Sequence, residues 1–286
     1  MSRAESLRSR ITASGPVLMP GVWDPLSALL AERAGFGTVF LSGFALSGTH
    51  LGEPDIGIIG QAEMADAARR VCRAVPGLEV VVDADTGYGG TSSVARTVEL
   101  WEQAGAAGMF LEDQEWPKKC GHMEGKRVVE RDEWLSKLRT ALRTRSDLHV
   151  TARTDARAVV SLDEAITRGK MAADLGVDAV FVEAPQSVAE MEAIAAALPG
   201  VRLVANMVEK GKTPLLTPVE LGELGFSLIV SPLSGLLAMT KALGDAYARL
   251  RALGTMRDGL GDMAGFDEFT DLVGLPKHLA NESTDR

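Results

Sequence analysis

The sequence is poor in the residues that mark several common classes of protein. Its 286 residues include only two cysteines, Cys72 and Cys120, so no disulfide framework holds the chain and a reducing cytoplasm is the expected compartment. A formal net charge of −9, with no basic stripe among aromatic residues, argues against a nucleic-acid surface. The N-terminal segment has a basic character but lacks the apolar core of a secretory signal. The most apolar stretch, residues 224–240, is interrupted by two glycines and a proline, so we predict no membrane-spanning helix.

Short apolar runs, many rich in β-branched residues, recur between helical patterns. Near-continuous runs of this kind are typical of parallel strands that are buried on both faces. There are eight, at residues 17–19, 39–41, 80–82, 109–111, 149–151, 180–182, 203–205 and 228–230. Eight strands that alternate with helices predict a (β/α)₈ barrel of the TIM type, with a doubly wound open sheet as the alternative.

The chain shows no Gly/Ser-rich or Pro-rich linker, so we predict one barrel domain over residues 1–286. Within it, residues 254–286 lie beyond the eighth unit and form a helix-rich, amphipathic C-terminal extension, which we expect to pack on the barrel or on a neighbouring subunit. Three helices between strands should begin with a capping box, a Ser or Thr followed three residues later by Glu. These are Ser161 with Glu164, Ser187 with Glu190, and Thr217 with Glu220.

Polar side chains follow nearly every predicted strand, at the end of the barrel where TIM-barrel chemistry gathers. Acids cluster after the third, fourth and sixth strands, among them Asp83, Asp85, Glu112 and Glu183. Carboxylates at one mouth repel each other unless a cation lies among them, and oxygen ligands without suitably spaced histidines favour Mg²⁺, with Mn²⁺ possible. The alternative is that one aspartate caps a helix while the other pairs with Arg153. Arg153 could instead clamp a substrate carboxylate.

The segment from 108 to 129 carries the most reactive pattern in the chain. After its strand it becomes a polar loop that holds Lys118, Lys119, Cys120 and His122, with glycines that let it fold tightly. Positive charge lowers a thiol pKa, so we expect Cys120 to favour its thiolate. A catalytic role for Cys120 is favoured over burial as a small hydrophobe, which is the interpretation for Cys72 in its helical run.

At these residues the chain resembles the isocitrate lyase/phosphoenolpyruvate mutase superfamily. The matching motifs cover most of the chain in the expected order: Leu41-Ser-Gly, Glu53-Pro-Asp-Ile-Gly, Val82-Asp-Ala-Asp-Thr-Gly-Tyr-Gly, Leu111-Glu-Asp-Gln, Lys118-Lys-Cys-Gly-His, Ala152-Arg-Thr-Asp-Ala, Phe181-Val-Glu-Ala-Pro, Ala205-Asn-Met-Val-Glu and Ser231-Pro-Leu-Ser. The Lys-Lys-Cys-Gly-His loop is the most specific of them. Residues 116–123 and 213–226 look most like the branch that contains petal death protein, 2,3-dimethylmalate lyase and carboxyphosphonoenolpyruvate mutase.

The resemblance implies a Mg²⁺-dependent lyase that cleaves a small 2-hydroxy dicarboxylate, such as a 2-alkylmalate, and also oxaloacetate, into a 2-oxo acid and a carboxylate. The alternatives are a carboxyphosphonoenolpyruvate phosphonomutase and a 2-methylisocitrate lyase. A homotetramer that exchanges a C-terminal helix between subunits is also implied.

The resemblance further implies roles for individual residues. Asp83 and Asp85 correspond to the metal ligands, and Cys120 to a general acid on a gating loop, with Lys118 and His122 supporting it. The implied catalytic set also contains Glu112 and Arg153. The implied substrate contacts are Ser42, Gly43, Phe44, Asp55, Gly121, Arg153, Glu183, Asn206 and Ser234.

One position departs from part of the superfamily. Phe40 stands where isocitrate and methylisocitrate lyases carry a tyrosine whose phenol is a candidate base for the substrate hydroxyl. That role is therefore unfilled here, which favours the alkylmalate branch. Glu112 or a metal-bound hydroxide could serve as the base.

Overall fold

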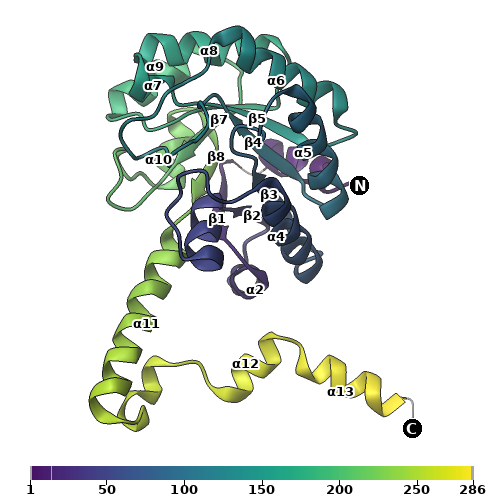
Figure 1. Ribbon diagram of the computed structural model, residues 1–286, viewed down its shortest axis with the longest axis vertical. Coiled ribbons are helices and arrows are strands. Elements are labelled where there is room, and N and C mark those ends of the chain that lie inside the picture. The colour runs from purple at the N-terminus through teal and green to yellow at the C-terminus, as the bar shows by residue number, and fades with distance from the viewer. Residues whose placement is uncertain (1, 14, 285–286) are drawn as a thin grey trace.

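The strands of this protein form a closed parallel barrel. The computed structural model describes residues 2–13 and 15–284, and in it each strand pairs with the next while β8 pairs with β1 (Figure 1). The strands are β1 (Val17–Val22), β2 (Thr38–Leu41), β3 (Glu79–Asp83), β4 (Gly108–Glu112), β5 (His149–Thr154), β6 (Ala179–Val182), β7 (Leu203–Asn206) and β8 (Phe226–Ser231). All eight predicted apolar runs lie in these strands, so the (β/α)₈ barrel is confirmed and the open sheet is wrong.

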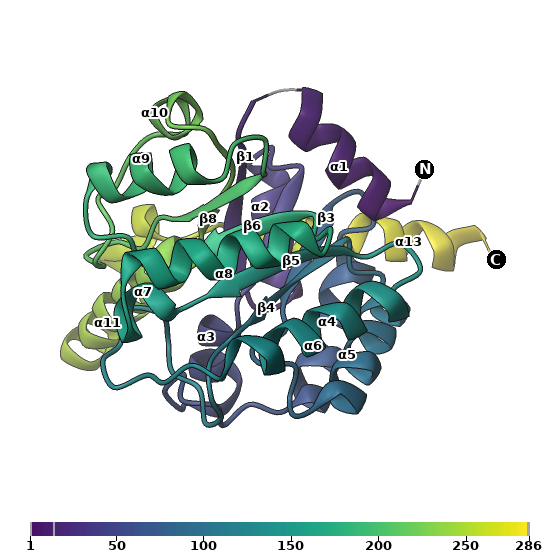
Figure 2. The same ribbon diagram turned by 90° about the horizontal axis from the view of Figure 1, so that it is seen from above.

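Helices accompany the strands, and most of them, apart from those at the C-terminal end, surround the barrel and cover its outer face (Figure 2). They are α1 (Arg3–Ala13), α2 (Pro25–Arg33), α3 (Gly43–Leu46), the π-helix η1 (Ser47–Leu51), α4 (Gln61–Ala74), α5 (Thr91–Ala104), α6 (Arg131–Thr144), α7 (Ala156–Val159), α8 (Leu162–Asp174), α9 (Val188–Ala197), α10 (Pro218–Glu223), α11 (Ser234–Leu253), the 3₁₀-helix η2 (Arg257–Asp262), α12 (Phe266–Leu272) and α13 (Leu275–Thr284). Ser161, Ser187 and Thr217 each cap a helix as predicted. The reciprocal bond of a full capping box forms only at Thr217, because Glu164 and Glu190 bind arginines instead.

Helix α1 packs against the amino-terminal end of the barrel. Its Leu7 and Ile11 belong to the same buried cluster as the inward-facing Met19, Phe40 and Phe110. Such packing removes apolar surface from water and fills the barrel interior with side chains. The carboxyl ends of the strands are therefore left as the end at which a ligand can enter.

The C-terminal helices lead away from the barrel. Helix α11 points outward, and η2, α12 and α13 continue beyond it (Figure 1). Apolar side chains along this extension are exposed, and Phe266 reaches 82%. An ion pair between Arg33 and Glu268 (3.0 Å) bridges α2 and α12. Among the described residues, none of the helices combines the length and apolar character that a membrane span needs. The extension thus presents an apolar surface that its own barrel leaves uncovered.

His149 gives a prediction for acid stability. The side chain is buried in β5, its Nε2 atom has no hydrogen-bond partner, and burial lowers its pKa from 6.5 to about 4. Between these two pH values the His149 imidazole is protonated in the unfolded chain and neutral in the folded chain. The folded state therefore keeps its full stability above pH 6.5 and loses about 3 kcal/mol as the pH falls to about 4.

A His149→Gln variant should lack this loss. Urea unfolding at pH 7.5 and at pH 4 should show the variant gaining about 3 kcal/mol relative to the parent at the lower pH. His278→Gln, at an exposed site on α13, is the matched control and should show no such gain. An equal stability difference at both pH values would contradict the role given to His149.

Candidate active site

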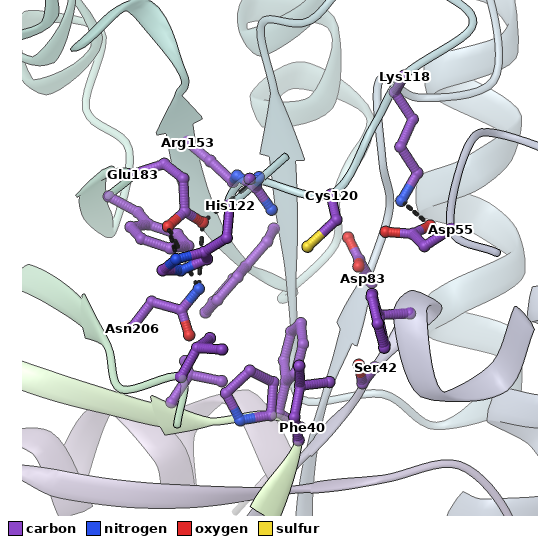
Figure 3. Close-up of a pocket in the computed structure, with 18 residues that line it drawn as sticks. Phe40, Ser42, Asp55, Asp83, Lys118, Cys120, His122, Arg153, Glu183 and Asn206 are labelled. Carbon is purple, nitrogen blue, oxygen red and sulfur yellow. Dashed lines mark hydrogen bonds and ion pairs between the residues drawn. The ribbon is translucent and has the colours of Figure 1, made fainter. Parts of the chain in front are cut away.

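A pocket lies at the carboxyl ends of the strands, with an empty volume of about 490 Å³ that includes its open mouth (Figure 3). Many of the residues predicted from the sequence line it: Ser42, Phe44, Asp55, Asp83, Lys118, Cys120, Gly121, His122, Arg153, Glu183 and Asn206. Figure 3 shows the Cys120 sulfur directed into the pocket between two polar groups, one around Lys118 and one around Arg153. Most of the site residues predicted from the sequence therefore lie together, because the carboxyl ends of the strands of a barrel meet at one face.

The first polar group is acidic. Asp83 ends β3, and its carboxylate accepts hydrogen bonds from the Gly43 and Asp85 amides at 3.3 and 3.2 Å. Asp85 follows it with φ +44° and is fully buried. The buried ammonium of Lys118 binds Asp55 and lies 2.7 Å from Oδ1 of Asp85. Three carboxylates thus surround one ammonium, which leaves an excess of negative charge.

Burial of these acids changes their protonation. Burial raises the pKa of Asp85 to about 7, although the Lys118 ammonium opposes the shift. Burial also raises the pKa of Glu112 well above its usual range, with Arg153 opposing. Oδ1 of Asp85 pairs with Lys118, but Oδ2 of Asp85 and Oε1 of Glu112 have no hydrogen-bond partner among the described residues. A cation would relieve the repulsion and provide those partners.

This donor set fits a hard divalent ion. In the part of the chain that the structure describes, no group of three or more His, Cys, Asp or Glu side chains is close enough to form a complete metal cage. Mg²⁺ does not need one, since it is usually bound by one or two carboxylates and keeps several waters. Asp83 and Asp85 supply such carboxylates, and Oδ2 of Asp85, which has no partner among the described residues, is the structural feature that favours a cation there.

The second polar group centres on Arg153 of β5. Its guanidinium contacts Glu112 (3.3 Å), Asp155 (3.0 Å) and Glu183 (3.3 Å). Burial alone would raise the pKa of Glu183, but Arg153 and its other polar neighbours lower it to about 2. Asn206 donates to both oxygens of this carboxylate at 3.2 and 3.3 Å. Arg153 pairs with acids at the strand ends and also lines the pocket. The alternative considered from the sequence, an ion pair of Arg153 with Asp83 or Asp85, is not among these contacts.

His122 joins this second group. Its Nε2 lies 3.4 Å from Oε1 of Glu183, and its Nδ1 accepts a hydrogen bond from the Lys212 amide at 3.0 Å. A Cβ atom at Gly211 would come within 2.7 Å of the His122 ring. The imidazole is thus packed between strand ends and the loop after β7, and Glu183 rather than Cys120 is its ion-pair partner.

The expectation of a Cys120 thiolate is wrong. Burial raises the pKa of Cys120 to about 11, assisted by Asp55 and Glu183, while a hydrogen bond from the His122 backbone and the charge of Arg153 oppose the shift. The two lysines next to the thiol in the sequence do not make it a thiolate. The Lys118 ammonium pairs with two aspartates, and the Lys119 ammonium donates to the Glu124 carbonyl. Cys120 therefore remains a neutral thiol, which can donate a proton. Cys72 is buried in the core, as predicted.

The loop from residue 113 to 130, called the reactive loop below, connects β4 with α6. Its two arms pair antiparallel at Gln114 and Val128. The Gln114 side chain accepts from the Lys119 amide at 2.9 Å and donates to the Lys119 carbonyl at 2.8 Å. The Cys120 amide donates to the Asp55 carbonyl at 3.2 Å. These backbone contacts hold the Cys120 segment over the pocket.

Four predicted residues lie beside the pocket rather than on its lining. Gly43 packs against Asp83, where a Cβ atom would come within 3.0 Å of the carboxylate. Asp85 and Glu112 are buried among the acids described above. Ser234, at the start of α11, bonds to Glu209 and lies 2.5 Å from the Ser231 hydroxyl. Their proposed roles remain predictions.

Sequence reasoning missed two kinds of residue. The apolar wall contains Phe110, Phe181, Val208, Val230 and Leu233, which only strand register could have assigned to a pocket. Lys126 was also missed: it is buried and binds the Gly121 carbonyl and Asp155. A third lysine in this polar loop was visible in the sequence, but nothing local indicates that it points inward.

Comparison with known proteins gives relatives that match nearly the whole chain. The family model described as phosphoenolpyruvate phosphomutase matches residues 7–251. Petal death protein of Dianthus caryophyllus is 46% identical over 98% of this chain and 89% of its own length. Chloroplastic carboxyvinyl-carboxyphosphonate phosphorylmutase of Arabidopsis thaliana is 47% identical over 93% of this chain and 79% of its own.

A crystal structure of 2,3-dimethylmalate lyase superposes with a TM-score of 0.94 at 32% identity, covering 100% of this chain and 96% of that one. That structure belongs to the PEP mutase/isocitrate lyase superfamily. The resemblance inferred from the motifs is therefore confirmed. By its barrel, its strand-end residues and these matches, the chain belongs to the phosphoenolpyruvate phosphomutase family of the PEP mutase/isocitrate lyase superfamily of lyases and mutases.

Proposed function

We propose that this enzyme is a Mg²⁺-dependent lyase that cleaves the C2–C3 bond of a 2-alkylmalate-like acid, and also oxaloacetate. The observation that carries the proposal is the neutral Cys120 thiol, directed into a pocket between an acidic group and an arginine. A lyase of this kind must protonate a carbanion-like product, and a thiol of raised pKa keeps its proton until that moment.

Each polar group has a part in this reaction. Mg²⁺ held by Asp83 and Asp85 would act as a Lewis acid toward the 2-hydroxyl and carboxylate oxygens of the substrate. Arg153, Asn206 and the Ser42–Phe44 segment would orient the carboxylates and stabilise charge on their oxygens. Glu112 is the proposed base: burial raises its pKa well above its usual range, so once ionised its carboxylate would readily accept the hydroxyl proton.

For a 2-alkylmalate the atoms and electrons balance without any further reactant, whereas oxaloacetate must first add water at C2, which supplies the hydroxyl, and then gives oxalate and acetate. The 2-hydroxyl loses its proton to the base, and its oxygen electrons form the new C=O bond of the 2-oxo acid. The C2–C3 bond breaks, and its electron pair gives the enolate of the leaving carboxylate. The Cys120 thiol then donates its proton to C3. Proton return from the base or solvent restores the thiol.

The apolar wall supports an alkyl substituent on the substrate. Phe40, Phe44, Val208, Val230 and Leu233 line the pocket beside the polar groups. A methyl or ethyl group gains free energy by leaving water for such a surface, whereas an additional carboxylate would need donors. An alkylmalate therefore fits better than 2-methylisocitrate, which remains the second alternative.

A substrate panel tests the proposal. With Mg²⁺ present, the release of 2-oxo acid is followed from 2-methylmalate, 2,3-dimethylmalate, 2-methylisocitrate and isocitrate, and the release of oxalate is followed from oxaloacetate. We expect the highest kcat/KM for an alkylmalate. No turnover with any of the five acids would reject the lyase proposal.

A phosphonomutase is the alternative with a specific observation in its favour, since the Arabidopsis relative bears that name. It would form a P–C bond from carboxyphosphonoenolpyruvate. Phosphorus NMR of a mixture that contains carboxyphosphonoenolpyruvate distinguishes the two functions, because only the mutase converts this carboxyphosphonate into a phosphinate with a second P–C bond. A phosphinate signal together with an inactive acid panel would establish the alternative.

We also propose a cytoplasmic homotetramer in which the C-terminal extension packs on a second copy of the chain. The exposed apolar side chains of α11, α12 and α13 support this arrangement, because surfaces of this kind are usually covered in an assembly. Removal of residues 255–286 should reduce the tetramer to smaller species in light scattering. A tetramer that survives the truncation would show that the extension is not the main contact.

A further inference from the structure

Lys126 is a second buried lysine of the reactive loop, and the proposed reaction gives it no role. Its side chain is 2% exposed, and its ammonium lies 2.8 Å from Oδ1 of Asp155 and binds the Gly121 carbonyl. Burying an ammonium is costly unless it is paired and hydrogen-bonded. Both of its partners belong to the pocket region. The cost of burying the ammonium is therefore offset only when the loop lies where Lys126 reaches both of them.

Asp155 connects that ammonium to the substrate-facing arginine. Its Oδ2 accepts from Nε of Arg153 at 3.0 Å, and its Oδ1 accepts from Nη2 at 3.3 Å. Asp155 directly follows β5, and its backbone amide donates to Asp113, the buried residue directly after β4, at 2.8 Å. Lys126 therefore ties the middle of the loop to a carboxylate held where β4 and β5 end.

The other partner of Lys126 lies next to the reactive thiol. Gly121 packs so closely on the second polar group that a Cβ atom would come within 2.6 Å of Glu183 and 2.7 Å of Arg153. The Gly121 carbonyl belongs to the peptide unit that leads into His122, one residue after Cys120. A contact that fixes this carbonyl also restricts where the Cys120 thiol can lie.

We propose that Lys126 is a positioning residue that holds the Cys120 thiol in the pocket by tying the Gly121 carbonyl to Asp155. Lys118, through Asp55 and Asp85, holds the loop on the opposite side of the thiol. The inference rests on the proposed function, in which Cys120 is the proton donor. Displacing a catalytic group by about 1 Å can lower a rate 10²-fold, so loss of the contact should lower turnover through proton delivery.

Alkylation of the two cysteines tests the proposal without any substrate. Iodoacetamide is added to the full-length enzyme at fixed pH, and mass spectrometry follows Cys120 and Cys72 separately. In Lys126→Met we expect the Cys120 rate to rise at least tenfold, while Cys72, buried in the core, stays unreactive. Lys119→Met is the matched control, since Lys119 is in the same loop and contacts only the Glu124 carbonyl through its ammonium. Its Cys120 rate should remain within twofold of the parent.

Two results would overturn the proposal. Equal Cys120 rates in the Lys126 and Lys119 variants would mean that Lys126 does not hold the thiol. A parallel rise at Cys72 would mean that the substitution loosens the whole fold. Lys126→Gln, whose amide can still donate to the Gly121 carbonyl, should give an intermediate Cys120 rate, and a rate equal to that of Lys126→Met would also count against the proposal.

Kinetics adds a second readout. With the best substrate of the panel, Lys126→Met should lower kcat about 30- to 100-fold with KM changed less than threefold, because the substrate contacts remain. A rise in KM at constant kcat would contradict a role in placing the proton donor. A silent substrate panel would reject the lyase function, but the alkylation rates would still decide whether Lys126 holds the loop.

Discussion

Replacing Cys120 with serine is expected to lower kcat for the best alkylmalate by about 10³-fold, because removal of a positioned general acid typically costs 10²- to 10⁴-fold. Serine keeps the size of the side chain, but its hydroxyl is a far weaker acid than a thiol. The substrate contacts on Arg153, Asn206 and Ser42 remain, so KM should change little.

The raised pKa of Cys120 also predicts how kcat/KM depends on pH. Since burial raises that pKa to about 11, the thiol stays protonated through neutral and mildly alkaline pH. The parent enzyme should therefore show no loss of kcat/KM from thiol ionisation near pH 8, where an ordinary cysteine begins to ionise. A descending limb near pH 8 that disappears in Cys120→Ser would contradict the neutral-thiol assignment.

Two controls separate chemistry from folding. Cys72→Ala removes the other thiol, which lies in the core, and should leave kcat within twofold of the parent. With 2,3-dimethylmalate in D₂O, the parent should place deuterium on one face of C2 of the propionate product, whereas the residual turnover of Cys120→Ser should label both faces, because water then protonates the enolate. Full activity in the serine variant would show that another group donates the proton.

The strands and the strand-end residues could be predicted because their causes are local or topological. A parallel strand buried on both faces needs a continuous apolar run, and the runs at 80–82 and 109–111 have no other ready interpretation. Once eight such strands are expected, the barrel rule places Asp83, Arg153 and Glu183 at one mouth. Periodicity alone could not distinguish a closed barrel from an open sheet.

The protonation state of Cys120 could not be predicted because it depends on the direction in which the neighbouring charged side chains point. In the sequence, Lys118 and Lys119 flank the thiol, and proximity in the chain suggested a thiolate. In the structure, Lys118 points to acids contributed by segments some 30 and 60 residues earlier, Asp85 and Asp55, so burial decides the pKa instead. The inward direction of Lys126 depends in the same way on Asp155, a residue of another strand end.

Replacing Asp85 with asparagine is expected to weaken Mg²⁺ binding by at least about 100-fold and to lower activity in proportion at limiting metal. Altering residues that merely support metal ligands already costs 10- to 100-fold, and a carboxylate ligand contributes its charge as well. Oδ2 of Asp85 is buried without a partner among the described residues, and the Lys118 ammonium at Oδ1 is shared with Asp55, so part of the Asp85 charge is left uncompensated. Treatment with EDTA should abolish turnover of the parent, and Mg²⁺ or Mn²⁺ should restore it.

Asp113→Asn is the matched control for this change. Asp113 is equally buried at the neighbouring strand end, but its carboxylate bonds to Thr154, the Asp155 amide and Arg168, away from the acidic group. Its loss should lower stability while leaving the Mg²⁺ dissociation constant, measured by titration calorimetry, within about threefold. If both variants weaken Mg²⁺ equally, the effect comes from the fold and not from ligation. If neither does, the ion is held by other residues, and the part of the Asp85 charge that Lys118 does not balance must be removed by protonation, as its pKa of about 7 would allow.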